Sequence, residues 1–375
     1  MNGARRSDAI VVGAGIVGAA CAAALARDGW RVTILERSFA SAGTTSVGMG
    51  HLVVMDDSPE QLALTQYSLH LWHELGPALD ARSELDPCGT LWVAEDESQL
   101  AALRTKRDVY AAAGVLAEVL DERGVSEAEP NLRPDLVGAL RVTGDGVVYP
   151  PGATLHLLET ARANGAVRRE GTEVRELVPN GVRLESETMH ADIVVNAAGT
   201  WSPRLTPGLP ITPRKGHLAI TDRYPGFCRH QIVELGYLAS AHVMTSESVA
   251  FNVQPRATGQ VLIGSSRELV GWDAQINRDI LRRMLERANH FMPRLGDLSV
   301  IRCWTGFRPA TPDKLPLIGR WDPIPGVWIA AGHEGLGITT SLGTAELLAD
   351  QIAGRATQID AAPFSPMRAI AAAHA

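Results

Sequence analysis

Cysteine is scarce in this chain, and its few cysteines lie far apart. The four cysteines among 375 residues, Cys21, Cys88, Cys228 and Cys303, include no C-x-x-C pair. That spacing argues against a zinc site and against a small scaffold held together by disulfides. We therefore expect no metal, and free thiols that suit a reducing cytoplasm.

Long apolar runs and concentrated positive charge are also missing. No segment reaches the roughly 20 apolar residues of a membrane-spanning helix. The apolar stretch at 9–26 differs from a signal peptide because it contains three glycines and follows Asp8. Asp and Glu number 42 against 35 Lys and Arg, a net charge of −7, and the basic residues are scattered. These absences predict a cytoplasmic protein that binds neither membranes nor nucleic acid, and they leave open whether it forms a homo-oligomer.

The first 36 residues have the pattern of a βαβ unit. Residues 8–13 are a β-branched apolar run that ends in glycine, which is typical of a buried parallel strand. Residues 16–27 are rich in alanine and lack proline, as expected of a helix, and 31–36 have the pattern of a second buried strand. Strand, helix and strand in this order predict the start of a nucleotide-binding domain.

A glycine fingerprint lies between the first strand and the helix. Gly13, Gly15 and Gly18 form G-x-G-x-x-G, a turn that lets backbone N–H groups and a helix N-terminus approach a pyrophosphate. Glu36 ends the second strand about 20 residues further on, where a carboxylate accepts hydrogen bonds from ribose hydroxyls. The fingerprint predicts a bound dinucleotide and does not by itself distinguish FAD from NAD.

The rest of the chain shows two kinds of pattern. Between 206 and 310, short alternating strands at 217–220, 249–253 and 261–264 are broken by Gly and Pro, which indicates an antiparallel sheet. Elsewhere we expect a loop at 38–50, helices at about 59–79, 97–113, 153–163, 277–290 and 339–352, and buried strands at 191–199 and 326–332.

These patterns predict an α/β protein, α+β overall, with one domain inserted into the other. The Rossmann-type cofactor domain is expected to be discontinuous, comprising 1–80, 140–205 and 315–375. The inserted substrate domain, built on a mainly antiparallel sheet, is expected at 81–139 and 206–314.

Further motifs follow the fingerprint in a fixed order. They are E-R at 36–37, G-T-T-S at 43–46, N-A-A-G-T-W-S at 196–202, W-T-G-F-R-P-A-T-P-D at 304–313, G-H at 332–333 and G-I at 337–338. In these motifs, over nearly the whole chain, the sequence resembles the D-amino acid oxidase family of FAD-dependent oxidoreductases, which includes glycine oxidase and sarcosine oxidase-like enzymes. The resemblance implies that the dinucleotide is FAD.

The resemblance also implies which residues contact the cofactor. The segment 43–46 is expected to run past the pyrophosphate toward the flavin, and the loop 332–339 is expected to close over the pyrimidine side of the flavin ring. The expected contacts are Gly13, Gly15, Ile16, Val17, Gly18, Glu36, Arg37, Gly43, Thr44, Thr45, Ser46, Gly48, Met49, Gly50, Val174, Ala198, Gly199, Trp201, Arg308, Gly332, His333, Gly335, Leu336, Gly337, Ile338 and Thr339.

Non-covalent FAD is expected from two departures from the family's pattern. Some sarcosine-type relatives tether the flavin through a histidine directly after G-T-T, where this chain has Ser46. Others use a cysteine near the position of Cys303, which here is about three residues out of register. Neither tether is therefore expected in this chain.

Arg308 is the residue expected to bind a substrate carboxylate. Its guanidinium suits bidentate binding, and its position matches the family's arginine in W-x-G-x-R-P. The family often places a second arginine in the G-H motif, but 334–336 is E-G-L in this chain. That departure weakens the case for a small substrate held between two arginines, such as free glycine.

Four other side chains are candidates for the substrate pocket, namely His51, Tyr237, Phe251 and Arg256. Hydride transfer from the carbon next to an amine needs a neutral amine and good alignment more than a catalytic base. No catalytic side chain is therefore required. His51 is the candidate for an assisting role, and for both His51 and His333 the alternative is a purely structural histidine.

The predicted function is oxidative deamination of glycine, an N-substituted glycine or a D-amino acid. Hydride would pass to flavin N5, and the resulting imine would hydrolyse to an oxoacid plus amine or ammonia. Oxidation of D-proline or D-hydroxyproline by a dehydrogenase with a non-oxygen acceptor is the alternative within the family. A nicotinamide-dependent dehydrogenase and a flavoprotein subunit without chemistry are the alternatives outside it. The strand at 261–264 lacks the lysine with which some oxidases activate oxygen, so dioxygen and other acceptors both stay open.

Overall fold

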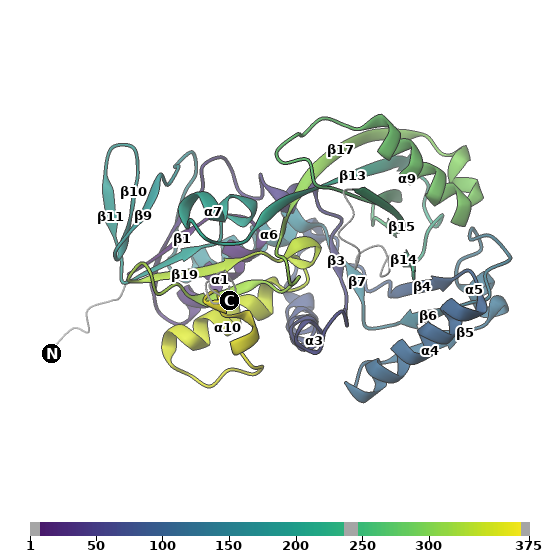
Figure 1. Cartoon of the computed structure of the whole chain (residues 1–375), viewed down its shortest axis with the longest axis horizontal. Coiled ribbons are helices and arrows are strands. Elements are labelled where there is room, and N and C mark those ends of the chain that lie inside the picture. The colour runs from purple at the N-terminus through teal and green to yellow at the C-terminus, as the bar shows by residue number, and fades with distance from the viewer. Residues whose placement is uncertain (1–7, 236–246, 369–375) are drawn as a thin grey trace.

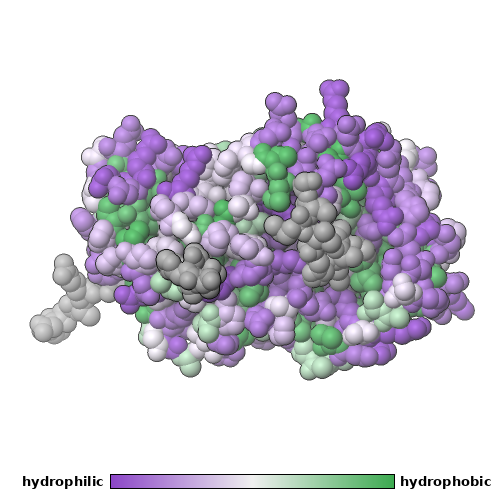
Figure 2. Space-filling model, in the orientation of Figure 1, coloured by the Kyte–Doolittle hydropathy of each residue, from purple (hydrophilic) through white to green (hydrophobic). Residues whose placement is uncertain are grey.

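A computed structural model describes residues 8–235 and 247–368 of the chain. Figure 1 shows two lobes side by side, one around a six-stranded sheet and the other around an eight-stranded sheet. Among the described residues, no helix is long and apolar enough to span a membrane. On the face shown in Figure 2, apolar residues are scattered among polar ones.

The six-stranded sheet contains the predicted βαβ unit. Its strands, in spatial order, are β18 (Leu317–Arg320), β19 (Val327–Ala331), β12 (Ile193–Asn196), β1 (Asp8–Val12), β2 (Arg31–Leu35) and β8 (Val167–Arg169). All neighbours run parallel except β18 and β19. The interior of β1 is buried because both faces of a parallel sheet are covered.

Helices pack beside this sheet and enclose the larger part of the core. They are α1 (Ile16–Arg27), α3 (Pro59–Leu75), α6 (Pro150–Ala163) and α10 (Ser341–Ala353). Helix α1 contacts both α6 and α10, and its many alanines allow this close approach. Helix α3 begins where the Ser58 hydroxyl accepts a hydrogen bond from the Gln61 backbone N–H and Pro59 occupies the first turn.

The eight-stranded sheet forms the second lobe. In spatial order its strands are β17 (Val300–Ala310), β13 (Thr212–Arg223), β16 (Gln260–Glu268), β15 (Glu247–Pro255), β14 (Gln231–Glu234), β4 (Thr90–Ala94), β6 (Gly138–Val142) and β5 (Ala117–Leu120). Only β14 and β4 pair in parallel. Helix α9 (Arg278–Phe291) packs on β15 and β16, and α4 (Glu97–Ala112) and α5 (Glu122–Ala128) flank β5 and β6.

Smaller elements connect the two lobes and extend the first. They include the antiparallel pair of β3 (His51–Leu52) and β7 (Gly146–Val147), and the three-stranded sheet of β9 (Glu176–Val178), β10 (Gly181–Arg183) and β11 (Thr188–His190). The short helices are α2 (Thr44–Val47) and α7 (Ser202–Leu205). The 3₁₀ turns are η1 (Gly76–Ala78), η2 (Ala81–Ser83), η3 (Gly199–Trp201), η4 (Pro293–Asp297), η5 (Glu334–Leu336) and η6 (Ala362–Phe364).

The predicted elements agree with the structure except at a few places. The segment expected as a loop at 38–50 contains the helical turn α2, and the helix expected at 59–79 ends at Leu75 because Pro77 follows. The antiparallel strands are longer than their apolar patterns. The expected domain boundary at 140 falls inside β6, a strand of the eight-stranded sheet.

Candidate functional site

A cavity of about 390 Å³ runs between the two lobes. One part of its wall comes from the ends of β1, β2, β12 and β19 in the six-stranded sheet, and another from β13, β15, β16 and β17 in the eight-stranded sheet. Parallel α/β sheets bind ligands at the carboxyl ends of their strands, where this cavity begins. Its size lies within the range of small-molecule sites.

Gly13 and Gly15 of the glycine fingerprint line this cavity. Gly13 has φ +108°, and a Cβ atom there would lie 2.6 Å from the carbonyl oxygen of Ala197. A Cβ on Gly18 would overlap the carbonyl oxygen of Gly13, so helix α1 packs on the strand only with glycine at this position. Gly15 is the N-cap of α1 and offers no side chain, which leaves the helix N-terminus open toward the cavity.

Glu36 lies beside the fingerprint at the end of β2. One carboxylate oxygen accepts a hydrogen bond from the Ala14 backbone N–H and the other from the Ser38 backbone N–H, both at 2.9 Å. These bonds fix the carboxylate at the cavity wall, and each oxygen retains a further lone pair for a hydroxyl. The cradle of backbone groups with this fixed carboxylate fits the pyrophosphate and ribose of FAD.

Two threonines connect the fingerprint to the second lobe. The Thr45 hydroxyl accepts a hydrogen bond from the Ile16 backbone N–H at 3.1 Å, and the Thr44 hydroxyl donates to the Phe307 carbonyl at 2.6 Å. Helix α2 therefore bridges α1 and β17 along the floor of the cavity.

Most of the expected cofactor residues line this one cavity. They are Gly13, Gly15, Ile16, Val17, Glu36, Arg37, Gly43, Thr44, Thr45, Gly48, Met49, Gly50, Val174, Ala198, Gly199, Trp201, Arg308, His333, Gly335, Gly337 and Ile338. Residues separated by more than 300 positions in sequence are brought together in this way.

Five expected residues support the wall rather than line it. Gly18 packs α1 on the strand, and the Ser46 hydroxyl donates to the Gly43 carbonyl. Gly332 faces Thr311, and Leu336 packs against the core. The Thr339 hydroxyl donates to the His51 carbonyl at 2.8 Å. These five residues lie outside the cavity lining, and their expected direct contact with the cofactor stays a prediction.

Trp201 belongs to an aromatic stack that joins the lobes. Trp272, in the segment between β16 and α9, stacks on Trp201 with ring centroids 4.1 Å apart, and Phe307 lies 5.4 Å from Trp272. The guanidinium groups of Arg37 and Arg204 lie 3.8 and 4.2 Å from the Trp201 ring centroid. Aromatic and cationic groups thus close one side of the cavity.

Arg308 enters the cavity from β17 in the second lobe. One of its terminal nitrogens donates to the Ser266 carbonyl at 2.9 Å. Gly216 on the adjacent strand β13 provides room for the guanidinium, since a Cβ there would overlap it. The arginine is therefore held by the sheet while it lines the cavity.

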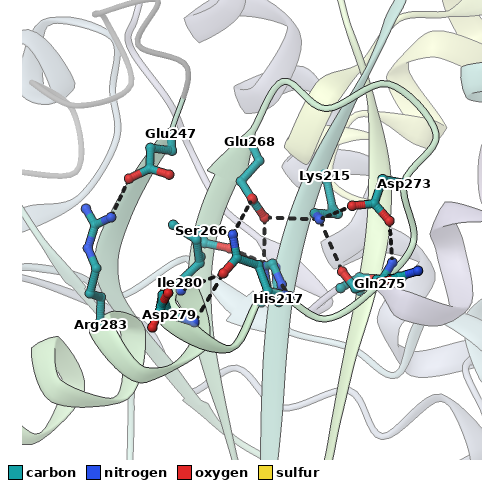
Figure 3. A network of polar contacts seen from close by, with 12 residues as sticks. Lys215, His217, Glu247, Ser266, Glu268, Asp273, Gln275, Asp279, Ile280 and Arg283 are labelled. Atoms are coloured by element: carbon teal, nitrogen blue, oxygen red, sulfur yellow. Dashed lines mark hydrogen bonds and ion pairs between the residues drawn. The ribbon is translucent and has the colours of Figure 1, made fainter.

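A buried polar network lies behind Arg308 and is shown in Figure 3. Lys215 Nζ lies 3.4 Å from Glu268 Oε2 and 3.5 Å from Asp273 Oδ2. The His217 backbone N–H donates to the Ser266 hydroxyl at 2.9 Å, and burial lowers the pKa of His217. The network joins β13 and β16 to the segment that carries Trp272.

His51 and His333 both line the cavity and are both held neutral. Burial, followed by the nearby charge of Arg308, lowers the pKa of His51 to about 3. Burial lowers the pKa of His333 to about 3 as well, and its Nε2 lies 3.0 Å from the Thr344 hydroxyl. His333 is thereby tied to α10, whereas His51 lies within the electrostatic influence of Arg308.

Two expected pocket residues lie elsewhere. Phe251 is fully buried and stacks on Phe291 of α9 with ring centroids 4.5 Å apart, so it belongs to the core. Arg256 pairs with Glu84 at 2.8 Å outside the cavity lining. Both assignments are corrected, and Tyr237 lies outside the described residues.

Asn252 and Glu334 line the cavity without having been expected there. Asn252 is the neighbour of Phe251, and because successive side chains of a strand face opposite sides, it faces the cavity while Phe251 faces α9. Its Oδ1 has no hydrogen-bond partner among the described residues. The glycine-rich motif around Glu334 marked the loop as a cavity wall, but nothing local to the sequence gave Glu334 a role.

Glu334 meets two further arginines from the second lobe. Its Oε1 lies 3.0 Å from Arg214 Nη1 of β13 and 3.7 Å from Arg267 Nε of β16. Burial acts to raise the pKa of Glu334, but the charges of Arg267, Arg214 and Arg308 together hold it below its usual value. Arg214 and Arg267 both come from the eight-stranded sheet, and neither lines the cavity.

Metal ligands and cysteines play no part in the described cavity. Residues 8–235 and 247–368 contain no cluster of His, Cys, Asp or Glu that could hold a metal ion. All four cysteines are free, and Cys303 packs against the core of the second lobe instead of lining the cavity.

Comparisons with known proteins agree with this architecture. The chain matches the family described as DAO, FAD dependent oxidoreductase, over residues 8–351. It is 30% identical over 432 residues to D-amino acid dehydrogenase of Cereibacter sphaeroides, covering 96% of this chain and 95% of that protein. It is 29% identical over 381 residues to glycine oxidase of Pseudomonas aeruginosa, covering 95% and 98%. The crystal structure of glycine oxidase from Geobacillus kaustophilus superimposes with a TM-score of 0.87 at 28% identity, covering 97% and 99%. The chain therefore belongs to the DAO family of FAD-dependent oxidoreductases.

Proposed function

We propose that this FAD-dependent enzyme oxidises the C–N bond of an amino acid, either glycine, an N-substituted glycine or a D-amino acid. The D-amino acid dehydrogenase and glycine oxidase relatives support this substrate class by their names. Bound FAD supplies the hydride acceptor, and the product imine hydrolyses in water to an oxoacid plus amine or ammonia. Family membership sets aside the nicotinamide-dependent alternative.

The observation that carries the proposal is Arg308 in the cavity. It is a fixed guanidinium on a rigid strand, near the flavin end marked by Gly48 and Ile338. A guanidinium binds a carboxylate through two parallel hydrogen bonds, which sets the distance and orientation of the adjacent α-carbon. Arg308 is thereby assigned the substrate carboxylate.

Other residues of the cavity suit a neutral amine. His51 is uncharged because of its low pKa, so it places a neutral imidazole, and no positive charge, in the cavity with the amine. The Oδ1 atom of Asn252 can accept an N–H of the amine, since it has no other partner among the described residues. We assign these two side chains to orienting the nitrogen, with no catalytic base required.

FAD is assigned to the fingerprint end without a covalent bond. Gly15 and the α1 N-terminus would hold the pyrophosphate, Glu36 the ribose, and the loop at 332–339 the pyrimidine side of the flavin. The position of Cys303 away from the lining supports the non-covalent assignment. Four free cysteines agree with a cytoplasmic location, which is also part of the proposal.

An anaerobic substrate screen tests the proposal. Purified holoenzyme is mixed with glycine, sarcosine, D-alanine and D-proline, and bleaching of the flavin is followed in the visible spectrum. We expect at least one of them to bleach the flavin, and Arg308→Met to weaken the response at least tenfold through loss of charge-assisted bonds. Arg302→Met, an exposed arginine on the same strand, is the matched control.

Two outcomes divide the alternatives. Recovery of colour with hydrogen peroxide release on admitting air identifies an oxidase, whereas recovery only with an artificial acceptor identifies a dehydrogenase. Bleaching that is identical in wild type and Arg308→Met would contradict the assignment of the substrate carboxylate.

A further inference from the structure

Three arginines from adjacent strands of the eight-stranded sheet gather at the substrate end of the cavity. Arg214 on β13 lies directly opposite Arg308 on β17 in the strand register, so both side chains project from the same face. Arg267 comes from β16, the next strand. Like charges placed directly opposite each other repel, and this face therefore requires an anion.

Glu334 supplies that anion from the other lobe. It lies in the loop after β19, with left-handed backbone at φ +46°, and its carboxylate lies 3.0 Å from Arg214. Gly335, the next residue, packs against the side chain of Arg308. Three acidic side chains line the cavity among the described residues, namely Glu36, Glu173 and Glu334. Glu36 and Glu173 lie toward the fingerprint, so Glu334 is the acid near Arg308.

One carboxylate does not satisfy all the donors of this face. Arg214 is 5% exposed, and its Nε and Nη2 have no hydrogen-bond partner among the described residues. Buried guanidinium nitrogens normally have partners. Arg214 does not itself line the cavity, whereas Glu334, its ion-pair partner, does.

We propose that Glu334 determines substrate specificity, because it fills the position of a second carboxylate on this arginine face and restricts the site to amines with a single carboxylate. The inference rests on the proposed function and narrows its substrate class. A monocarboxylate pairs with Arg308 and leaves the Glu334–Arg214 pair intact. The second carboxylate of a dicarboxylate meets the negative charge of Glu334, and Arg214 is already paired with that glutamate.

The experiment compares two acids of equal length, butyrate and succinate, as ligands of the holoenzyme. Binding is measured by calorimetry and by the change in the visible flavin spectrum, so it does not depend on turnover. Wild type should bind butyrate about tenfold or more tightly than succinate. Glu334→Gly opens a path to Arg214 and keeps the left-handed backbone unstrained. It should improve succinate binding relative to butyrate by about tenfold, the value of one charge-assisted pair.

Three variants make this result specific. In Glu334→Gly combined with Arg214→Met, the gain for succinate should disappear. Glu84→Gly removes another left-handed glutamate that pairs with an arginine, but outside the cavity, and should leave the butyrate-to-succinate ratio unchanged. Glu334→Gln keeps the side-chain volume and removes the charge, so it should shift the ratio in the same direction by a smaller factor. It carries the test if Glu334→Gly fails to fold.

The inference is overturned if wild type binds succinate as tightly as butyrate. It is also overturned if neither Glu334 variant changes the ratio of the two affinities. Failure of both acids to bind wild type, with the flavin present, would instead overturn the carboxylate site of the proposed function.

Discussion

Replacing Asp145 with asparagine should stabilise the protein, and more strongly at high pH than at low pH. Asp145 lies in the turn between β6 and β7 and is 1% exposed. Burial raises the pKa of its carboxyl from 3.8 to about 7, because the Thr90 hydroxyl, the Val54 backbone N–H and the charge of Lys106 offset only part of the desolvation. At neutral pH the folded chain therefore carries a partly ionised carboxylate in a dry position.

The size of the effect follows from linkage. The Asp145 carboxyl binds its proton more tightly in the folded protein than in the unfolded chain. The protonated carboxyl therefore contributes to the free energy of unfolding in full below pH 3.8, and this contribution is lost as the pH rises through about 7. At about 1.4 kcal/mol per pH unit, the loss is about 2 kcal/mol by pH 5 and about 4 kcal/mol by pH 8. Asparagine never ionises, and its amide oxygen can still accept the Val54 N–H bond at this position.

Urea unfolding of the FAD-saturated enzyme at pH 5, 6.5 and 8 measures this effect. The advantage of Asp145→Asn over wild type should grow by about 2 kcal/mol between pH 5 and pH 8. Asp108→Asn, on an exposed face of α4, is the control and should show no such growth. An advantage that is constant with pH, or a variant less stable than wild type at pH 8, would refute the reasoning.

Three further predictions concern the cavity. His51→Asn should change the rate of flavin reduction by the same factor at pH 6 and pH 9 in stopped-flow measurements. The reason is that the pKa of His51 is about 3, so the side chain is neutral at both pH values. If the substitution removed a step near pH 6.5 from the pH profile of this rate, the reasoning would be contradicted. Gly18→Ala places a methyl group against the Gly13 carbonyl. It should lower the free energy of unfolding by about 1–3 kcal/mol and cause release of FAD. An unchanged melting temperature with full flavin content would count against that packing. Trp272→Ala removes the stack on Trp201 and should speed FAD release two- to tenfold, since such a pair contributes about 0.5–1.5 kcal/mol. The release rate is measured by the rise of flavin fluorescence, and an unaltered rate would contradict the prediction.

The local parts of the fold were predictable from the sequence because their signals are local. The βαβ unit depends on apolar runs, on the spacing of Gly13 and Gly18, and on an acid at a fixed distance, all within 36 residues. The cavity lining near Trp201 and Ile338 followed from motifs that resemble a known family. Because the family places these motifs at fixed positions in its fold, the resemblance predicted where their residues would lie.

The failures come from strands whose two faces look alike and from pairs distant in sequence. The end of β15 is buried on both sides, so the apolar pattern does not show that Phe251 faces the core and Asn252 the cavity. Arg256 and Glu84 are 172 residues apart, and Arg214 and Glu334 are 120 apart. A sequence contains no local signal for such ion pairs, because they form only when two lobes meet.

The cavity between the lobes has a consequence for how the protein matures in the cell. Since its walls come from both sheets, a molecule bound there adds contacts that neither lobe makes alone, and ligand binding to the folded state stabilises it by mass action. At a free FAD concentration of a thousand times the dissociation constant, this amounts to about 4 kcal/mol. FAD supply during synthesis should therefore influence how much enzyme escapes proteolysis, so that flavin availability acts as a quality-control signal for the newly made chain.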